Sequence, residues 1–224
     1  AIKRSVVDHL GDQLSPNYSA VRKDWEKLLR QKNHYLKEEV DQSVLLSIND
    51  VMATVGAQLY CLRSTIVKGL IPYIQKAYQD IAGCHECIDI AYIPSWMRHD
   101  ISREHYQDVP YEKERHVTLF GPHMDSIEFF INQKNAHDFA SQGQQRSLVL
   151  SYKMAEVDFI TDKLNQKPVL LLDDVMSELD SFRRRALLSL INGSVQTFIT
   201  STNRDYFTPE LLESARIVTL EGDT

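Results

Sequence analysis

Two acidic residues follow an apolar segment in the second half of the chain. Asp173 and Asp174 come directly after residues 169–172, which read Val-Leu-Leu-Leu. A carboxylate at the end of a buried strand can hold Mg²⁺ beside bound phosphates, usually through water. The adjacent carboxylate can orient or deprotonate an attacking water. We therefore predict that Asp173 binds metal and Asp174 acts as the base. The alternative is that one carboxylate caps the next helix and the other is a surface charge.

A polar turn centred on glycine precedes this pair, at residues 141–147 (Ser-Gln-Gly-Gln-Gln-Arg-Ser). Gly143 has no Cβ, so backbone N–H groups there can approach a phosphate closely. The hydroxyl of Ser141 can add another donor. An ordinary polar N-cap is the alternative. Because the acidic pair follows the turn along the chain, we predict an anion site at the start of this helix.

The usual cradle for a triphosphate is absent from the sequence. No Gly-x-x-x-x-Gly-Lys-Ser/Thr loop occurs anywhere in the 224 residues. This polypeptide therefore lacks the Mg²⁺-binding hydroxyl and the phosphate loop that such sites normally contain.

The first 83 residues have the apolar periodicity of helices. One helix covers 1–14, a second opens at Ser15-Pro16, and a third runs from about 44 to 82, where Gly69 and Pro72 should kink or break it. Basic residues, Lys32 among them, should form the polar face of the second helix. Two amphipathic helices joined by a short turn predict an antiparallel hairpin, either a piece of a bundle or a lever or docking arm.

Strands and helices alternate after Gly83. The predicted strands are 88–93, 116–120, 127–131, 169–172, 195–200 and 216–220. The predicted helices follow Gly143, with Leu148, Tyr152, Ala155 and Phe159 on one side, and cover 182–191 and the region of Leu211. Residues 94–115 should be mainly loop. This order predicts an α/β fold with a mostly parallel sheet. The continuous apolar run 169–172 is typical of a strand covered on both faces.

Composition limits the partners and the compartment. The net charge of −6 gives no general attraction to nucleic acid, so DNA contact would require a local basic face. The arginine run 183–185 is the densest basic stretch, although such runs usually form a solvated face. Three cysteines favour a reducing, cytoplasmic setting. Cys84 and Cys87 have the spacing of a zinc half-site, but ordinary thiols are the preferred interpretation. No signal peptide is expected, and no continuous apolar run approaches the roughly 20 residues of a membrane span.

Three segments closely resemble the RecF family of bacterial recombination mediators: residues 141–147, 170–180 and 197–202. These mediators are ATPases of the ABC type, related to the SMC and Rad50 heads. Gly121-Pro122-His123 and residues 28–33 are also similar, and the resemblance spans essentially the whole chain. It implies the C-terminal lobe of an ABC-type ATPase head plus an antiparallel helical arm. Residues 1–14 would be the end of a missing N-terminal lobe, 15–83 the arm, and 84–224 the second lobe of the head.

The resemblance also implies roles for individual residues. Asp173 and Asp174 would be the Walker B pair, with ATP and Mg²⁺ as cofactors. Residues 177–180 would be the D-loop, which crosses a dimer interface near Asp180, and Thr202 and Asn203 would lie at the switch position. The ABC signature, contacting the nucleotide held by a second subunit, would include Ser141, Gln142, Gly143 and Gln144.

The family loads RecA onto gapped DNA with RecR and RecO and dimerises on ATP. We therefore expect a cytoplasmic, nucleoid-associated DNA-repair ATPase with no membrane partner. The Walker A lobe is missing, so the isolated chain should turn over little or no ATP. Gly-Pro-His is followed here by Met124, Asp125 and Ser126, where the family tends to have a basic and two acidic residues. The role of this turn is thus left open. The alternatives are a non-enzymatic partner-binding module of DNA repair and, less favoured, an SMC or Rad50 head, whose coiled coil would be longer.

Overall fold

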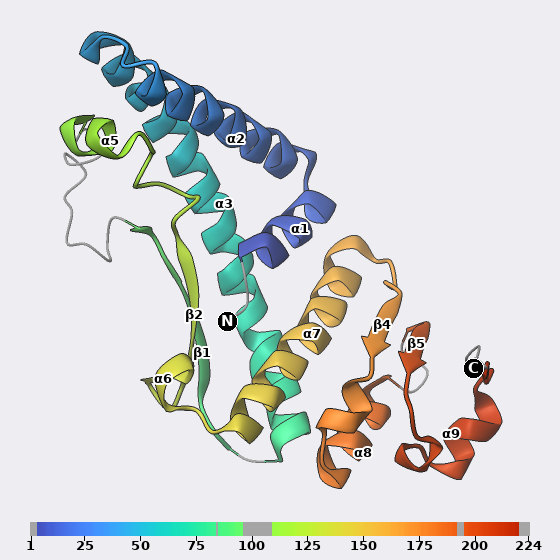
Figure 1. Cartoon of the computed structure of the whole chain (residues 1–224). Helices are drawn as coiled ribbons and strands as arrows, with labels where there is room; N and C mark the ends of the chain where they lie inside the picture. The colour runs from blue at the N-terminus through green and yellow to red at the C-terminus, as the bar shows by residue number, and fades with distance from the viewer. Residues whose placement is uncertain (1–3, 84, 96–108, 192–194, 220–224) are drawn as a thin grey trace, which may run out of the picture. The chain divides into compact units, whose positions relative to one another are not determined.

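The structure is a computed structural model that describes residues 4–83, 85–95, 109–191 and 195–219. It divides into two compact units, Ala1–Gln166 and Lys167–Thr224. The first contains the long helices and an antiparallel sheet, and the second contains a pair of parallel strands (Figure 1).

Three helices open the first unit: α1 (Arg4–Leu14), α2 (Pro16–Lys37) and α3 (Gln42–Ala82). Ser15 is the N-cap of α2 and Pro16 its first residue, a position where the fixed φ of proline suits a helix. The α2 and α3 helices form the predicted antiparallel hairpin (Figure 1). Gly83 ends α3 with a left-handed φ of 64°, as glycine commonly does at this position.

The expected break in α3 does not occur. The helix continues through Gly69 and Pro72. Proline removes one hydrogen bond from a helix, but both sides of this region are held by packing. Leu70 and Ile74 are fully buried, and a Cβ on Gly69 would lie only 3.0 Å from the ring of Phe159. Core packing therefore outweighs the local effect of the proline.

The α3 helix is long and apolar, although no continuous apolar run within it approaches the length of a membrane span. Within the described residues it is the one helix that is long and apolar enough to cross a membrane by length and composition, with a mean hydropathy of 1.3 over 18 residues. Its inward face forms much of the core of the first unit and includes the buried Arg63. Helices at the centre of a globular core commonly have such a composition.

An antiparallel sheet packs against α3. It consists of β1 (Ile88–Ile93), β2 (Ser126–Ile131) and the short β3 (Lys134–Asn135) in that order, with Ile88 opposite Ile131. The predicted strands at 88–93 and 127–131 are confirmed. Helix α6 (Ala136–Phe139) leads to α7 (Gln142–Leu164), which packs along α3. The predicted inner face of α7 is confirmed, because all four of its residues are buried: Leu148, Tyr152, Ala155 and Phe159.

The predicted strand at 116–120 is wrong. A helix, α5 (Val109–Arg115), precedes this segment, and His116 then has a left-handed φ of 51°. The backbone N–H of Thr118 donates to Asn33 Oδ1 at 2.8 Å, and that of Leu119 donates to Glu112 Oε1 at 2.9 Å. Side chains from the helices thus accept the N–H groups that a neighbouring strand would otherwise accept. The remainder of the expected loop, residues 96–108, lies outside the described residues.

Lys32 does not lie on the polar face of α2, contrary to the sequence prediction. Its side chain is 3% exposed, and its Nζ lies 2.5 Å from Glu112 Oε2. Burial lowers the pKa of Lys32, and the carboxylate of Glu112 partly offsets that effect. Helical periodicity gave no sign of this, because the partner carboxylate comes from α5, 80 residues further along the chain.

This ion pair gives a stability prediction. We expect Lys32→Met to lower the free energy of unfolding by about 3 kcal/mol, because Glu112 would remain buried without its counter-ion. The double variant Lys32→Met/Glu112→Gln should recover most of the loss, since glutamine still accepts the N–H of Leu119. Urea denaturation monitored by circular dichroism provides the measurement. Equal losses in the single and double variants would contradict the expectation.

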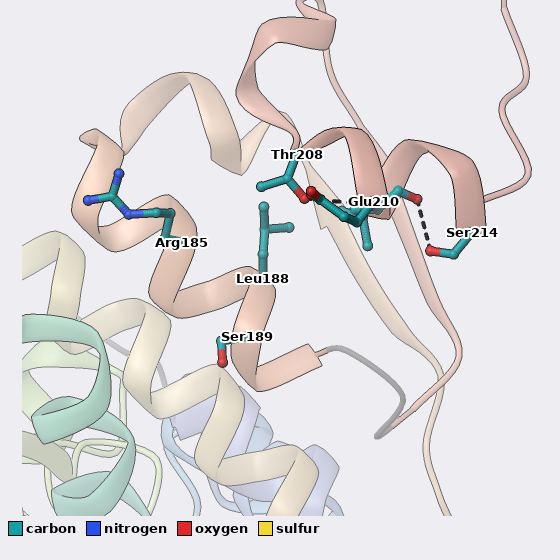
Figure 2. A pocket seen from close by; sticks show the side chains of 7 residues that line it. Arg185, Leu188, Ser189, Thr208, Glu210 and Ser214 are labelled. Carbon is teal, nitrogen blue, oxygen red and sulfur yellow. Dashed lines mark hydrogen bonds between the residues drawn. The ribbon is translucent and has the colours of Figure 1, made fainter.

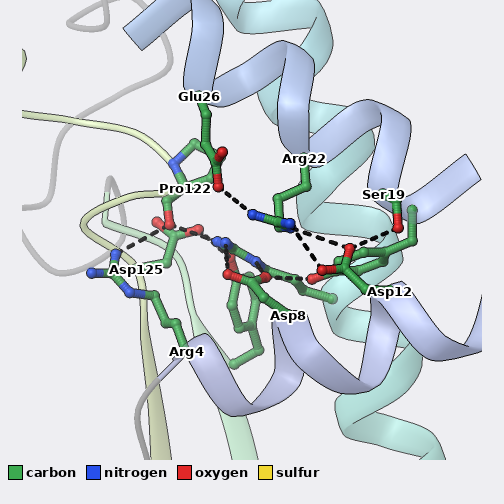
Figure 3. A network of polar contacts seen from close by, with 11 residues as sticks. Arg4, Asp8, Asp12, Ser19, Arg22, Glu26, Pro122 and Asp125 are labelled. Carbon is green, nitrogen blue, oxygen red and sulfur yellow. Dashed lines mark hydrogen bonds and ion pairs between the residues drawn. The ribbon is translucent and has the colours of Figure 1, made fainter. Parts of the chain in front are cut away.

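A polar network holds α1, α3 and the Gly121-Pro122-His123 turn together (Figure 3). The guanidinium of Arg63 pairs with both oxygens of Asp8 at 2.9 Å and donates to the carbonyl of Pro122 at 2.6 Å. Arg4 donates to the same carbonyl at 3.1 Å, and Tyr92 donates to Asp125. The network therefore joins the helices to the turn and to β1.

The turn itself packs on Trp25 of α2. Gly121 has a φ of 128°, and a Cβ there would lie 2.6 Å from the Trp25 ring, so only glycine fits. The ring of His123 stacks on Trp25 with centroids 5.9 Å apart, and burial lowers the pKa of this histidine. The turn whose role the sequence left open thus packs on α2 and is linked to β1 through the polar network.

The second unit contains the parallel strands β4 (Leu170–Asp173) and β5 (Thr197–Thr200). Between them lie the 3-10 helix η2 (Val175–Glu178) and α8 (Ser181–Ile191), and after them come η3 (Arg204–Tyr206) and α9 (Pro209–Ser214). The predicted α/β class is confirmed. Parallel pairing is seen in this unit, whereas the larger sheet of the first unit is antiparallel.

Two predictions for this unit are wrong. The β4 strand is covered on one face only, because Leu170 and Leu172 are buried while Leu171 is 72% exposed. Phe198 on β5 is also exposed. Residues 216–219 are not a strand, since no neighbouring strand in the described part of the chain pairs with them; residue 220 lies outside that part. A strand needs a partner for its backbone hydrogen bonds.

Candidate nucleotide site

The acidic pair lies at the carboxyl end of the parallel strands. Asp173 is the last residue of β4 and is in register with Thr200 of β5. The Thr200 hydroxyl donates to Asp173 Oδ1 at 2.5 Å and accepts the backbone N–H of Asp174 at 3.0 Å. Both carboxylates are exposed. In α/β sheets, ligands bind at this end of the strands.

Asp174 has a left-handed backbone, with a φ of 46°. Such a conformation is uncommon outside glycine and is concentrated at functional sites. The hydroxyl of Ser177 donates to Asp174 Oδ2 at 2.9 Å, and the carboxylate makes no capping hydrogen bond to η2. The helix-cap alternative is therefore not realised for this residue.

Thr200 is a site residue that the sequence interpretation missed. It lies within the segment 197–202 that carries the resemblance, two residues before the predicted site residue Thr202. The predicted pairing of two parallel strands could have identified Thr200, because the last residues of neighbouring parallel strands meet at one edge of the sheet. Thr202 itself is exposed between β5 and η3, and Asn203 caps η3 by accepting the N–H of Asp205 at 2.9 Å.

The serine-glycine turn begins α7 with a capping box. Ser141 Oγ accepts the backbone N–H of Gln144 at 3.2 Å, and Gln144 Oε1 accepts the backbone N–H of Ser141 at 2.8 Å. Gly143 does not have a positive φ, so backbone conformation does not require glycine there. The N-cap alternative is thus realised. It is compatible with anion binding, because the first N–H groups of a helix have no partner within the helix.

Asp180 lies at the start of α8. Its Oδ1 accepts the backbone N–H of Arg183 at 2.9 Å, and its carboxylate also pairs with the Arg183 guanidinium. These contacts lower the pKa of Asp180, and the backbone hydrogen bond from Arg183 makes the largest contribution. The carboxylate is exposed. The structure therefore gives Asp180 a local capping role, and its predicted place at a dimer interface stays a prediction.

The arginine run 183–185 is not a uniform solvated face. Arg184 donates to the carbonyl of Met176 at 2.8 Å, and its guanidinium lies 4.0 Å from the centroid of the Tyr206 ring. Arg184 thus joins η2 to the segment after β5. Of the three arginines, Arg183 and Arg184 are partly buried and Arg185 is exposed.

Arg185 lines a shallow pocket of about 330 Å³ between α8 and α9 (Figure 2). None of the predicted site residues lines this pocket. The residues that line it are Arg185, Leu188, Ser189, Thr208, Glu210, Leu211 and Ser214.

The predicted site residues fall in both units. Ser141, Gln142, Gly143 and Gln144 belong to the first unit, whereas Asp173, Asp174, Asp180 and Thr202 belong to the second. Among the described residues, no group of three or more His, Cys, Asp or Glu side chains could hold a metal by itself. The carboxylates at the strand ends suit Mg²⁺, which keeps several waters and binds through one or two carboxylates plus phosphates. Cys87 is a free, exposed thiol, and Cys84 lies outside the described residues.

Comparison with known proteins identifies relatives. No family model matches the chain. "DNA replication and repair protein RecF" of Lactobacillus gasseri is 35% identical over 241 residues, which cover 100% of this chain and 64% of that protein. RecF of Geobacillus kaustophilus is 37% identical over 231 residues, covering 96% and 62%. A solved structure described as the recombination mediator protein RecF-ATP in the RecFOR pathway superposes with a TM-score of 0.76 and 25% identity, covering 90% of this chain and 57% of that chain.

The parallel pair ending in two carboxylates, together with the long helices and the antiparallel sheet, defines the fold of an ABC-type ATPase head. Within that class, the chain is similar to proteins named RecF over 96% to 100% of its length. It spans slightly less than two thirds of the length of these relatives.

Proposed function

We propose that this chain supplies the signature, Walker B, D-loop and switch segments of a RecF-like ATPase that acts in DNA repair and recombination. The observation that carries the proposal is the geometry at the strand ends. Thr200 holds Asp173 and the backbone of Asp174 at the edge of a parallel pair. The relatives' names support DNA repair, and one solved relative is described with ATP.

The residues have distinct roles in this proposal. Asp173 holds Mg²⁺, which neutralises charge on the phosphates when bound. Asp174 orients the attacking water and accepts its proton, and the bond from Ser177 fixes the carboxylate for that task. Ser141, Gln142, Gly143 and Gln144 form the signature turn that meets a nucleotide held by a second copy. Residues 177–180 form the D-loop, which crosses the dimer interface near Asp180, and Thr202 lies at the switch position.

The exposed apolar face of the parallel pair supports the rest of the proposal. Leu171 is 72% exposed and Phe198 is 56% exposed. Apolar side chains of this size seldom form an uncovered sheet face. We propose that a lobe carrying the phosphate loop covers them, that residues 1–14 adjoin that lobe, that 15–83 form the arm, and that 84–224 form the second lobe of the head.

The partners follow from the family and are part of the proposal. The intact protein binds double-stranded or gapped DNA, dimerises on ATP, and acts with RecR and RecO to load RecA, within the cytoplasm and at the nucleoid. The net charge of −6 means that DNA contact depends on local basic surface.

Reconstitution tests the proposal. The chain is combined with the part of the Lactobacillus gasseri RecF that it does not cover, and ATP hydrolysis and ATP-dependent dimerisation are measured. We expect neither part alone to turn over ATP and the combination to do so. If the combination forms but neither binds nor hydrolyses ATP, the ATPase proposal is wrong, and retained binding to DNA or repair proteins would then favour a non-enzymatic module.

A further inference from the structure

The carboxylate of Glu86 connects the end of α3 to the signature turn. Glu86 Oε1 accepts the side-chain amide of Gln144 at 2.6 Å, and Oε2 accepts the hydroxyl of Tyr78 at 2.6 Å. We propose that Glu86 is a positioning residue for the signature turn. This inference rests on the proposed function, because it assigns the support of the same nucleotide site.

The side chain of Gln144 is engaged at both ends. Its Nε2 donates to Glu86, while its Oε1 accepts the backbone N–H of Ser141. Glu86 thereby sets the orientation of the amide, and the amide in turn sets the position of Ser141. Gln144 holds the turn through its side chain, so contact with the nucleotide is left to the Ser141 hydroxyl and to backbone N–H groups of the first helical turn.

Glu86 is itself held firmly. Tyr78 is fully buried in the core of the first unit. On the other side of Glu86, the backbone N–H of Cys87 donates to Asn132 Oδ1 at 2.9 Å, and the Cys87 carbonyl accepts the N–H of Asn132 at 2.8 Å. The β1 strand starts at the next residue. The backbone next to Glu86 is therefore fixed to the residue that follows β2. The carboxylate of Glu86 is fixed to α3 through the Tyr78 hydroxyl.

A carboxylate suits this place chemically. It offers acceptors to two donors at once, and hydrogen bonds to an ionised acceptor are about twice as strong as neutral ones. Glutamine can keep both contacts, because the Tyr78 hydroxyl can accept an N–H as well as donate. Alanine removes both contacts and releases the Gln144 amide.

Two measurements test Glu86, each on Glu86→Ala, Glu86→Gln and the control Glu114→Ala, an exposed glutamate on α5. In the reconstituted ATPase, we expect Glu86→Ala to raise the ATP concentration for half-maximal turnover about tenfold, while kcat changes less. Glu86→Gln should stay within about threefold of the unsubstituted protein, and Glu114→Ala should be unchanged. In the 224-residue chain, amide hydrogen exchange at 141–145 should accelerate about tenfold in Glu86→Ala and little elsewhere.

The two measurements separate the two claims. An ATP dependence and an exchange rate in Glu86→Ala that match the unsubstituted protein would overturn the role of Glu86. If the reconstituted protein has no ATPase activity but exchange at 141–145 still accelerates, Glu86 holds the turn and the proposed function is wrong. Should Glu86→Ala fail to fold, Tyr78→Phe, which removes one contact to the carboxylate, replaces it, with a smaller acceleration expected at the same amides.

Discussion

Replacing Asp174 by Asn is expected to reduce ATP turnover of the reconstituted protein by about 100- to 10,000-fold, the usual contribution of a positioned general base. Asparagine keeps the shape of the side chain but cannot take a proton at neutral pH. It also tolerates the left-handed backbone found at this position, so strain does not confuse the result. Single-turnover ATP hydrolysis at saturating Mg²⁺ provides the measurement.

Two further variants sharpen this test. Asp173→Asn should raise the Mg²⁺ concentration required for turnover, because its carboxylate is the proposed metal ligand. Asp50→Asn, an exposed change on α3, should leave turnover as it is. Full activity in Asp174→Asn would show that the base is assigned to the wrong residue, and an unchanged Mg²⁺ requirement in Asp173→Asn would do the same for the metal ligand.

Arg63→Met is expected to have the largest effect on stability, about 5 kcal/mol lost from the free energy of unfolding of the first unit. The side chain of Arg63 is 5% exposed and donates hydrogen bonds to the carboxylate of Asp8, the Pro122 carbonyl and the Tyr92 hydroxyl. Methionine fills a similar volume but leaves the carboxylate without its charge partner. Removing one partner of a buried ion pair usually lowers the free energy of unfolding by about 3–5 kcal/mol. We expect the upper end of that range because three acceptors lose their donor at once.

The control for Arg63 is Arg22, which also pairs with carboxylates in the same region (Figure 3). Its side chain is 22% exposed, and its partners are more exposed still. We expect Arg22→Met to cost about 1 kcal/mol or less. Chemical denaturation of the three proteins compares them directly. A similar loss for both variants would mean that the Arg63 network is no more important to the fold than a surface ion pair.

Several elements were predictable because their signals are local. Ser15-Pro16 marks the start of α2, and the apolar spacing after Gly143 marks the inner face of α7. Residues 141–147 begin a helix, and the acidic pair follows a strand, as the order of residue types indicated. Each of these depends on neighbours within one or two turns of the chain, so the sequence is sufficient to predict them.

The errors share one cause. Helical periodicity places Lys32 on the polar face of α2, yet its side chain is buried in an ion pair with Glu112. Residues 116–120 have the composition of a strand, yet the side chains of Asn33 and Glu112 accept backbone N–H groups of this segment. Leu171 belongs to a continuous apolar run, yet it faces outward from a sheet of two strands. In each case a partner from a distant part of the chain, or the lack of one in the described residues, decides the outcome.

The amino-acid sequence alone was enough to predict the residues that carry the proposed chemistry: the acidic pair at 173–174 and the turn at 141–144. Only the tertiary structure decided what holds them, namely Thr200 at the end of the adjacent strand and Glu86 between Tyr78 and Gln144. The physical reason is that reactive groups are recognised by type and local spacing, whereas hydrogen-bond partners are set by the approach of segments that periodicity does not relate.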